Sequence, residues 1–328
     1  MKGSKNDKGI QIRRRIKAFF YGLRYAVRHA IRYARNVNSD YYASEENFLP
    51  ILISNYHVIE KCLAMPNFEL GHAKERVGVV CIDLVKYKEL GFDTNNPQFI
   101  AALQSVEEYN AVHKKASFKL PVELQTAIDN ALSLKNVEVY NQPLVTNDNF
   151  YSKLTGTFED FAKSRHSLRT YSDKNIELDV LKDCVDIART TPTACNRQPN
   201  KTYIITQKEL ISKIVNVQGG GRGFAENSNK ILIVTSSVSV FNNNELFEAL
   251  KSGGMYAMNL LYALHSKKIG VCPLLWGEDI KKDNYLRKLI NIPDNEEIII
   301  IYACGYPTSE FKYVTSVRNE LDKSMVVV

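Results

Sequence analysis

Two short runs of apolar, mostly β-branched residues in the C-terminal half constrain the fold of this chain most. Lys230–Ser236 and Glu297–Cys304 each predict a buried strand, and Thr202–Thr206 predicts a shorter one. Helical periodicity is found over Ile176–Ala188 and Ser252–Lys268. Because few of these segments repeat as strand, helix and parallel strand, the pattern favours an α+β layer over a doubly wound sheet.

The preceding region, residues 38–150, is expected to be mostly helical. Four stretches have helix-like periodicity, with Pro or Gly between them: Asn55–Met65, Val77–Leu90, Pro97–His113 and Pro121–Leu134. The polar stretch Asn141–Asn149 contains Pro143 and predicts a boundary near residues 145–155. We therefore expect three parts, residues 1–37, 38–150 and 151–328.

Charge is concentrated in the first of these parts. Residues 1–37 hold eleven Lys or Arg and one acid, a net of +10, and the whole chain carries +7, so the other 291 residues carry a net of −3. A slightly acidic body argues against a nucleic-acid-binding protein with a wide basic face. The question becomes what one basic arm contacts.

The arm has the pattern of an amphipathic helix. Between Ile10 and Val37, apolar residues recur in steps of three and four, and arginines fill the opposite side. Such a helix can lie in a membrane interface against anionic lipid, or it can dock on its own protein with a solvated basic face. Amphipathicity alone does not separate these interpretations. Nothing in the arm resembles a base-reading element, so no nucleic acid partner is expected.

No other segment indicates a membrane-spanning or secreted protein. The chain lacks the roughly 18 consecutive apolar residues that a bilayer span needs, and its basic N-terminus lacks the apolar core and cleavage site of a secretory signal. Six cysteines occur singly, without C-x-x-C pairs, so neither a zinc site nor a disulfide framework is indicated. We expect a cytoplasmic protein without a metal site, peripheral at the inner membrane face if the arm binds lipid.

The first segment with recognisable chemistry is Arg165–Tyr171, with the sequence RHSLRTY. In an extended backbone alternate side chains share a face, so Arg165, Ser167 and Arg169 would point the same way. Two guanidinium forks around one hydroxyl suit a phosphate group, and each charge-assisted hydrogen bond contributes roughly 1.5–3 kcal/mol. Taken alone, however, the segment is better explained as a solvated basic strand.

Four further segments follow it in a fixed order. They are Thr191–Pro199 (TPTACNRQP), Gly253–Leu260 (GGMYAMNL), Ile269–Leu274 (IGVCPL) and Gly305–Pro307 (GYP). Each is weak evidence alone. The ordered series resembles the nitroreductase family of FMN-dependent oxidoreductases, across residues 155–328.

The resemblance implies a nitroreductase-like α+β fold in which helices flank an antiparallel-type central sheet. It also implies an obligate homodimer, with one FMN at each of two sites built from both subunits. NAD(P)H would reduce the flavin, and a small-molecule acceptor would then take the electrons. Because a flavin supplies the hydride chemistry, the protein needs donors and positive charge around the ring more than an acid or base. No catalytic residue is therefore named.

A set of cofactor-binding residues follows from the same resemblance. The segment that holds the ribityl phosphate is matched by Arg165, His166, Ser167 and Arg169. The segment that reaches the flavin from the partner subunit is matched by Pro192, Thr193, Ala194, Asn196 and Gln198. The stretch along the isoalloxazine ring is matched by Pro273, Leu274 and Leu275, and the arginine that closes the phosphate site by Arg318.

Some features depart from the family pattern. The core is short, so the insertions that usually cover the substrate pocket are reduced. The N-terminal half would supply that cover. Leu275 and Trp276 stand where many members carry an acidic residue and glycine, and we expect the indole to pack in the core. The glycine run at 219–223 fits neither phosphate-binding fingerprint and is expected to form a loop beside the flavin.

A narrower resemblance concerns His57–Pro66 (HVIEKCLAMP). It is similar to a region of nitroreductase-like proteins associated with bacterial surface-polysaccharide biosynthesis, which tend to have glycine where Cys62 stands. His57, Glu60 and Lys61 would share one helical turn, for which a surface salt-bridge set is favoured over a catalytic group.

Two hypotheses of function result. The leading one is an FMN-dependent oxidoreductase that uses NAD(P)H to reduce an acceptor within surface-polysaccharide biosynthesis. The alternative is a non-catalytic component that keeps the flavin fold and binds or assembles on membrane glycan machinery.

Overall fold

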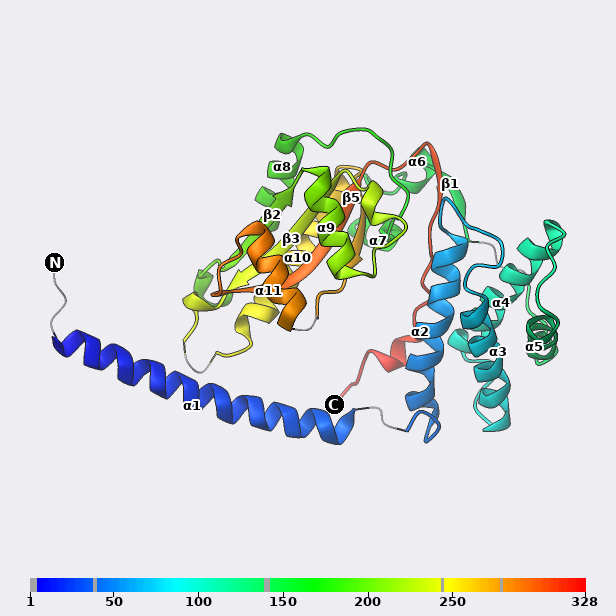
Figure 1. Ribbon diagram of the computed structural model, residues 1–328, viewed down its shortest axis with the longest axis horizontal. Helices are drawn as coiled ribbons and strands as arrows, with labels where there is room; N and C mark the ends of the chain where they lie inside the picture. The colour runs from blue at the N-terminus through cyan, green and yellow to red at the C-terminus, as the bar shows by residue number, and fades with distance from the viewer. Residues whose placement is uncertain (1–4, 38–39, 139–141, 243–244, 278–279) are drawn as a thin grey trace. The chain divides into compact units, whose positions relative to one another are not determined.

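The chain forms two units, and each unit combines two stretches of sequence. The first contains Met1–Val37 and Tyr151–Thr308, and the second contains Asn38–Phe150 and Ser309–Val328. The computed structural model describes residues 5–37, 40–138, 142–242, 245–277 and 280–328 (Figure 1). The last twenty residues, which we expected within a part spanning 151–328, thus pack with the N-terminal helices.

A four-stranded antiparallel sheet is the centre of the first unit. Its order is β2 (Asn200–Ile205), β3 (Lys230–Ser237), β5 (Glu296–Gly305) and β4 (Gly270–Leu274). The two inner strands pair through apolar residues such as Ile233 and Ile301. Every neighbouring pair is antiparallel, so the α+β class predicted from the sequence is confirmed.

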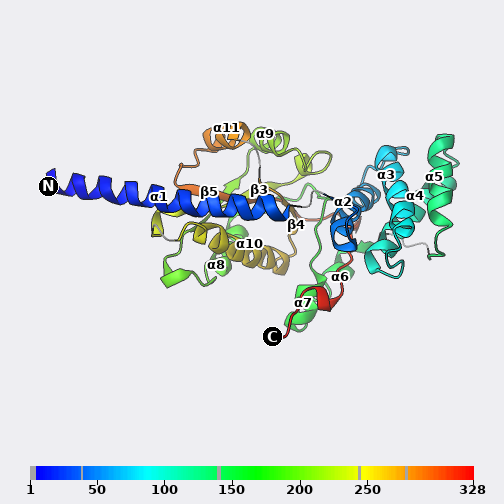
Figure 2. The same ribbon diagram turned by 90° about the horizontal axis from the view of Figure 1, so that it is seen from below.

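Helices cover both faces of this sheet (Figure 2). One face is covered by α8 (Leu178–Ala188) and α10 (Glu248–Ser266), and the other by α9 (Lys208–Gln218) and α11 (Ile280–Ile290). α10 lies close to the strands because Gly253 has no side chain, and a Cβ there would clash with the side chain of Ile299. α9 and α11 were not expected, and β4 was singled out only for its motif.

Shorter helices connect these elements. α7 (Phe158–Ser164) precedes the RHSLRTY segment, and 3-10 turns occupy Ala194–Asn196, Ala225–Asn227, Val238–Val240 and Leu321–Lys323. Thr157 caps the start of α7, because its hydroxyl accepts a hydrogen bond from the backbone N–H of Asp160 at 3.2 Å.

Four helices build the second unit around an apolar core of its own. They are α2 (Glu45–Leu63), α3 (Lys74–Glu89), α4 (Pro97–Lys115) and α5 (Val122–Leu132). The side chain of Ser44 caps α2 by accepting from the backbone N–H of Asn47, and Pro97 opens α4 after the capping residue Asn96. All four helices were predicted from periodicity and are confirmed, although α2 begins at Glu45 rather than at Asn55.

A short sheet joins the two stretches of the second unit. β1 (Leu144–Thr146) pairs antiparallel with β6 (Glu310–Lys312), and α6 (Asn147–Phe150) follows β1. The ring of Phe150 packs 5.1 Å from the ring of Phe311. Gln98 of α4 donates a hydrogen bond to the carbonyl of Val317 at 3.3 Å, which holds the C-terminal stretch against this unit.

The basic arm is a single helix, α1 (Lys5–Asn36), of 32 residues. Its apolar side chains are exposed: Phe19 is 65% and Phe20 is 62% exposed. None of the described side chains between residues 10 and 37 is buried, although the ring of His29 lies 5.5 Å from the ring of Phe247. In the parts of the chain that the structure describes, no helix has the length and apolarity needed to cross a bilayer.

Candidate functional site

The RHSLRTY segment runs in extended conformation beside the edge strand β4. The backbone N–H of Leu168 donates to the carbonyl of Val271 at 3.0 Å, and the Leu168 side chain is buried. Arg165, Ser167 and Arg169 occupy the alternate positions of the segment, and each is partly exposed. The segment therefore places two guanidinium groups and a hydroxyl at the side of the sheet that ends in β4.

Arg169 has an unusual environment. Its Nε is buried and has no hydrogen-bond partner among the described residues. Its guanidinium carbon lies 5.8 Å from the centre of the Phe224 ring. Buried donors in folded proteins are almost always paired, so this N–H group marks a position suited to an acceptor oxygen.

A buried histidine lies behind the segment. Nε2 of His265, on α10, is 3.0 Å from Oγ of Ser164, and the ring packs near those of Tyr151 and Phe161. Burial, and to a smaller extent electrostatic repulsion from Arg165 and His166, lower the pKa of His265 to about 4. His265 is therefore neutral near pH 7, and the positive charge stays on the segment in front of it.

The end of β4 meets the glycine loop that follows α9. Gln218 is nearly buried; its Oε1 accepts from the backbone N–H of Gly221 at 2.9 Å, and its Nε2 donates to the carbonyl of Leu275 at 3.0 Å. A Cβ on Gly221 would lie 3.1 Å from Cδ1 of Leu274. The side chain of Leu275 is 80% exposed, so this backbone forms an open wall next to the loop.

The residues beside Leu275 differ in how far they are buried. Pro273 is half-buried, and the Leu274 side chain is buried. Trp276, which we expected in the core, is only partly buried, and its indole N–H donates to Asp283 of α11 at 3.2 Å. The prediction that this indole packs in the core is wrong, because its N–H group donates a hydrogen bond to the carboxylate of Asp283 at the surface.

The Thr191–Pro199 segment lies at the opposite edge of the sheet. It leads directly into β2, which is separated from β4 by β3 and β5. Three strand spacings amount to about 14 Å. Pro192, Asn196 and Gln198 are exposed, whereas Thr193 and Ala194 are half-buried. Within one chain, therefore, this segment and the β4 wall lie at opposite edges of the sheet.

A cavity of about 440 Å³ lies beside that segment, along the outer edge of β2. Its lining includes Thr193, Gln198, Asn200, Lys201, Tyr203 and Tyr256. The Tyr256 hydroxyl of α10 and the Thr202 hydroxyl of β2 are 2.9 Å apart and fix one wall. No sequence pattern indicated this cavity, because its walls come from elements that are distant along the chain.

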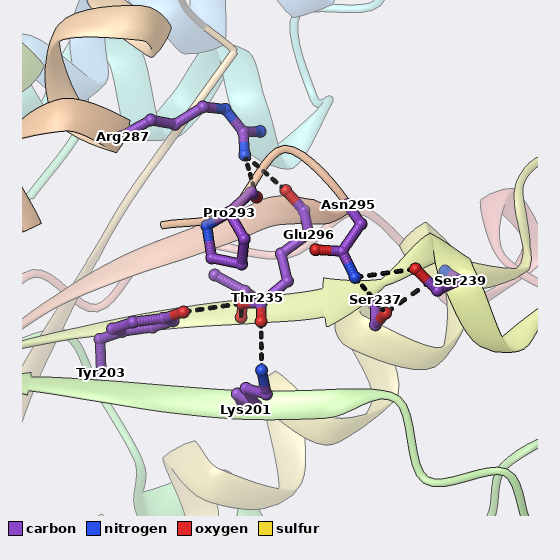
Figure 3. Close-up of polar contacts among 9 residues, drawn as sticks. All are labelled: Lys201, Tyr203, Thr235, Ser237, Ser239, Arg287, Pro293, Asn295 and Glu296. Carbon is purple, nitrogen blue, oxygen red and sulfur yellow. Dashed lines mark hydrogen bonds and ion pairs between the residues drawn. The ribbon is translucent and has the colours of Figure 1, made fainter. Parts of the chain in front are cut away.

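A buried carboxylate ties the adjacent strands together (Figure 3). Glu296 at the start of β5 accepts hydrogen bonds from Lys201 and, at 3.0 Å and 2.7 Å, from Tyr203 and Thr235. Burial by itself would raise the pKa of Glu296, but these donors outweigh it and leave the pKa lowered. Arg287 of α11 donates to the Glu296 carbonyl at 2.7 Å. We interpret this cluster as structural.

Arg318 belongs to the second unit. It follows the stretch that Gln98 holds, its side chain is exposed, and it donates to the carbonyl of Ser316 at 3.0 Å. The structure thus gathers the Arg165–Arg169 segment and the β4 wall in one unit and places Arg318 in the other.

The His57, Glu60 and Lys61 cluster lies on α2. Nδ1 of His57 is 3.0 Å from Oε2 of Glu60, but Glu60 is only 3% exposed, so the interpretation as a surface salt bridge is wrong for this carboxylate. Burial raises the pKa of Glu108, and the charge of Glu60 adds to that increase. Among the described residues, no group of three or more His, Cys, Asp or Glu could hold a metal.

Two residues of the site were missed by sequence reasoning. Gln218 bridges the glycine loop and the β4 wall, and Phe224 packs under Arg169. The run of glycines between them was the one available signal, since it indicates a backbone that approaches another segment closely.

Comparisons with known proteins agree with this geometry. Residues 162–232 and 238–306 match the Nitroreductase family. A protein of Archaeoglobus fulgidus, provisionally named an NADH dehydrogenase/NAD(P)H nitroreductase, is 24% identical over 148 residues, which are 45% of this chain and 83% of that protein. A protein of Methanothermobacter thermautotrophicus with the same provisional name is 25% identical over 150 residues, 44% of this chain and 74% of that protein.

Solved structures are similar over the same part of the chain. A nitroreductase family protein of Streptococcus pneumoniae has 18% identity and a TM-score of 0.45, covering 52% of this chain and 100% of that one. An FMN-dependent nitroreductase of Clostridium difficile has 20% identity and a TM-score of 0.41, covering 47% of this chain and 90% of that one.

The matched residues include the segments from which the resemblance was drawn. Arg165–Tyr171, Thr191–Pro199, the α10 motif and the β4 motif all lie between residues 162 and 306. This part of the chain also contains the complete four-stranded sheet. The part of the chain that resembles the Nitroreductase family is therefore the part that contains this sheet.

Proposed function

We propose that this chain is an FMN-dependent oxidoreductase that takes electrons from NAD(P)H and passes them to a small-molecule acceptor. The observation that carries the proposal is the buried Nε of Arg169, which lacks a protein partner among the described residues. It lies in the segment that the family uses to hold the ribityl phosphate. A phosphate oxygen is an acceptor that suits it, since charge-assisted bonds of arginine to phosphate are strong and geometrically specific.

The residues around Arg169 fit an FMN. Ser167 and Arg165 lie on the same extended segment, so that Arg165, His166, Ser167 and Arg169 would hold the phosphate. The stretch Pro273, Leu274 and Leu275 would lie along the ring, with Leu275 as its exposed residue. Gly221 keeps the facing loop free of a side chain that would meet Leu274.

The chain's own part in the reaction is binding and positioning. When bound, FMN supplies hydride transfer. The positive charge of the RHSLRTY segment offsets the charge of the phosphate, and neutral His265 supports that segment without adding a charge. Gln218 fixes the loop and the Leu275 carbonyl relative to each other, which sets the width of the site beside the ring.

A homodimer would bring the two halves of the site together. Pro192, Thr193, Ala194, Asn196 and Gln198 lie at the β2 edge of the sheet, so they suit the flavin of a second copy better than that of their own. Exposed apolar side chains on α10 support such an interface: Leu250, Met255 and Met258 all face solvent in the single chain. Arg318 is proposed to close the phosphate site.

The test is to load the purified protein with FMN and measure stoichiometry and reduction. We expect about one FMN per chain, because each site uses one RHSLRTY segment. Anaerobic addition of NADH or NADPH should remove the visible absorbance of the bound flavin. A protein that takes up no FMN would contradict the proposal, and a protein that binds FMN without reduction would favour the non-catalytic alternative.

We further propose that α1 binds an anionic membrane surface from the cytoplasmic side. Support comes from its net charge of +10 over residues 1–37 and from its apolar side chains, none of which is buried in the described range. Each Lys or Arg near an anionic bilayer contributes about 1 kcal/mol, and inserted aromatic side chains add to this.

Vesicle sedimentation tests this second proposal. The protein should sediment with anionic phospholipid vesicles at low salt, and much less with neutral vesicles or at high salt. The variant Phe19→Glu/Phe20→Glu should lose the interaction, whereas Val326→Glu/Val327→Glu, which changes two even more exposed apolar residues and adds the same charge, should keep it. Equal binding by both variants would contradict the role of α1.

We propose surface-polysaccharide biosynthesis as the setting of the reaction. The likeness of His57–Pro66 supports it, and so does the basic arm, which suits a membrane-bound assembly. Deleting the gene in its host and measuring cell-surface polysaccharide tests this setting. An unchanged polymer would contradict it without affecting the oxidoreductase proposal.

A further inference from the structure

The turn before β2 has a strained backbone. Cys195, Asn196 and Gln198 have φ angles of 51°, 55° and 49°, in the left-handed region that residues with a side chain seldom adopt. Three such residues within four positions persist only if the surroundings hold them there. Asn196 and Gln198 are the amide side chains that the proposed function assigns to the flavin.

Bonds within the turn account for part of that restraint. The backbone N–H of Asn196 donates to the carbonyl of Thr193 at 2.9 Å, and the backbone N–H of Gln198 donates to the Thr193 hydroxyl at 3.1 Å. These bonds close the turn on itself. They do not fix its position relative to the rest of the domain.

Arg197 connects the turn to another segment. Its two terminal nitrogens each lie 2.7 Å from a carboxylate oxygen of Glu245, and one of them also donates to the carbonyl of Val240 at 3.1 Å. Its Nε donates back to the carbonyl of Ala194 at 2.9 Å, and the guanidinium lies 4.8 Å from the centre of the Phe241 ring. Among the described residues 193–198, every hydrogen bond to a distant segment comes from this side chain.

Glu245 is itself fixed. It accepts from the backbone N–H of Asn242 at 2.7 Å, and the bonds from Arg197 and Asn242 lower the pKa of Glu245 to about 2. The pair is shielded, with side chains 19% and 23% exposed. Bidentate arginine–carboxylate pairs of this kind hold orientation as well as distance. The segment that contains Glu245 leads directly into α10.

We infer that Arg197 is a positioning residue that, through its ion pair with Glu245, holds the turn in the strained backbone that presents Asn196 and Gln198 to FMN. This inference rests on the proposed function, because it assigns the turn its ligand. Arg197 does not touch the flavin. It sets the direction of the two neighbouring amides.

The experiment compares four variants with the wild-type protein by amide hydrogen exchange, FMN affinity and thermal unfolding. The variants are Arg197→Ala, Arg197→Lys, Glu245→Gln and the exchanged pair Arg197→Glu/Glu245→Arg. Lys182→Ala is the control, because Lys182 forms an ion pair with Asp179 on the surface of α8 at 2.7 Å, and both side chains are mostly exposed. Amide hydrogen exchange of residues 193–199 is measured without flavin, and FMN affinity is measured by flavin fluorescence.

For Arg197→Ala we expect exchange in the turn to accelerate about tenfold or more, because the strained conformation opens more often. FMN affinity should fall about tenfold or more, since misplaced binding groups lose their alignment. The thermal unfolding midpoint of the flavin-free protein should change little. Arg197→Lys should have intermediate exchange rates and an intermediate FMN affinity, because lysine lacks the planar fork. The exchanged pair should restore part of the exchange protection and part of the FMN affinity.

The outcomes separate the inference from the proposed function. If the wild-type protein binds FMN and Arg197→Ala binds it equally well, the inference is overturned and the proposed function stands. If exchange in the turn is unchanged in Arg197→Ala, the inference is overturned whatever the affinity. If the wild-type protein binds no FMN, the proposed function fails, and with it the flavin role of Arg197.

Discussion

The guanidinium group of Arg169 lies against the ring of Phe224, with 5.8 Å between the guanidinium carbon and the ring centre. Phe224 follows the glycine loop, and that loop packs on the end of β4 at Gly221 and Leu274. Cation–π attraction orients the guanidinium while its Nε has no hydrogen-bond partner among the described residues. One contact thus connects the segment proposed to bind phosphate to the wall proposed for the flavin ring.

The first prediction concerns this arginine. Replacing Arg169 by Ala should weaken FMN binding by about 10- to 150-fold, the equivalent of one charge-assisted hydrogen bond. Arg169→Lys should recover little, because lysine cannot supply the Nε donor. Flavin fluorescence titration measures the affinity, with Lys182→Ala as the control. Unchanged affinity in Arg169→Ala would exclude this residue from the site.

The second prediction concerns the exposed apolar side chains of α10. The variant Leu250→Asp/Met258→Asp should be monomeric and should lose FMN, because charges in a dimer interface are not compensated. Light scattering after gel filtration measures the mass. Val122→Asp, at a more exposed apolar residue of the other unit, should remain dimeric. A monomeric wild-type protein that binds FMN would rule out the dimer.

The third prediction concerns pH. The pKa of His265 is lowered to about 4 in the folded protein, whereas the unfolded chain has the ordinary value near 6.5. The unfolded state therefore binds the proton first, so stability is lost as the pH falls from about 6.5 towards 4, by up to about 3 kcal/mol. Across this pH range, the free energy of unfolding measured in urea should change less steeply with pH in His265→Gln than in the wild-type protein. His72→Gln, at an exposed histidine, should keep the wild-type slope.

The fourth prediction concerns the approach of α10 to the sheet. Gly253→Ala should destabilise the protein by about 1–3 kcal/mol, because the added methyl group overlaps the Ile299 side chain. Gly78→Ala in α3 should instead stabilise it by about 0.5–1 kcal/mol, since its Cβ would make an ordinary contact, 3.8 Å from Leu124. Denaturant midpoints measure both changes. An increase in stability for Gly253→Ala would show that the helix can move away.

Local patterns made much of the fold predictable. The helices α3, α4 and α5 and the strands β3 and β5 have strong periodicity or a dense run of β-branched residues, and their positions agree with the expected ranges, whereas α2 begins ten residues earlier than expected. α9 and α11 were not expected, because the polar residues of their exposed faces dilute the apolar pattern. β4 contains Pro273, which weakens a strand signal, although a proline is tolerated at the sheet edge where β4 lies.

Long-range relationships were not predictable. The β1–β6 pairing joins Val145 to Phe311, and no local signal connects residues so far apart. The same holds for Arg197 and Glu245, whose ion pair depends on where two loops end in space. The ordered motifs placed the proposed flavin segments in sequence, whereas their separation across the sheet required the strand order.

The interleaving of the two units has a consequence for biosynthesis. The helices α2 to α5 leave the ribosome early, but β6 and the stretch that follows it are synthesised only after the whole of Tyr151–Thr308. Until then, β1 has no strand to pair with and Phe150 lacks Phe311 as a packing neighbour. The half of the protein that is translated first is thus the last to be completed, and an arrested nascent chain would expose its unfinished edge to chaperones.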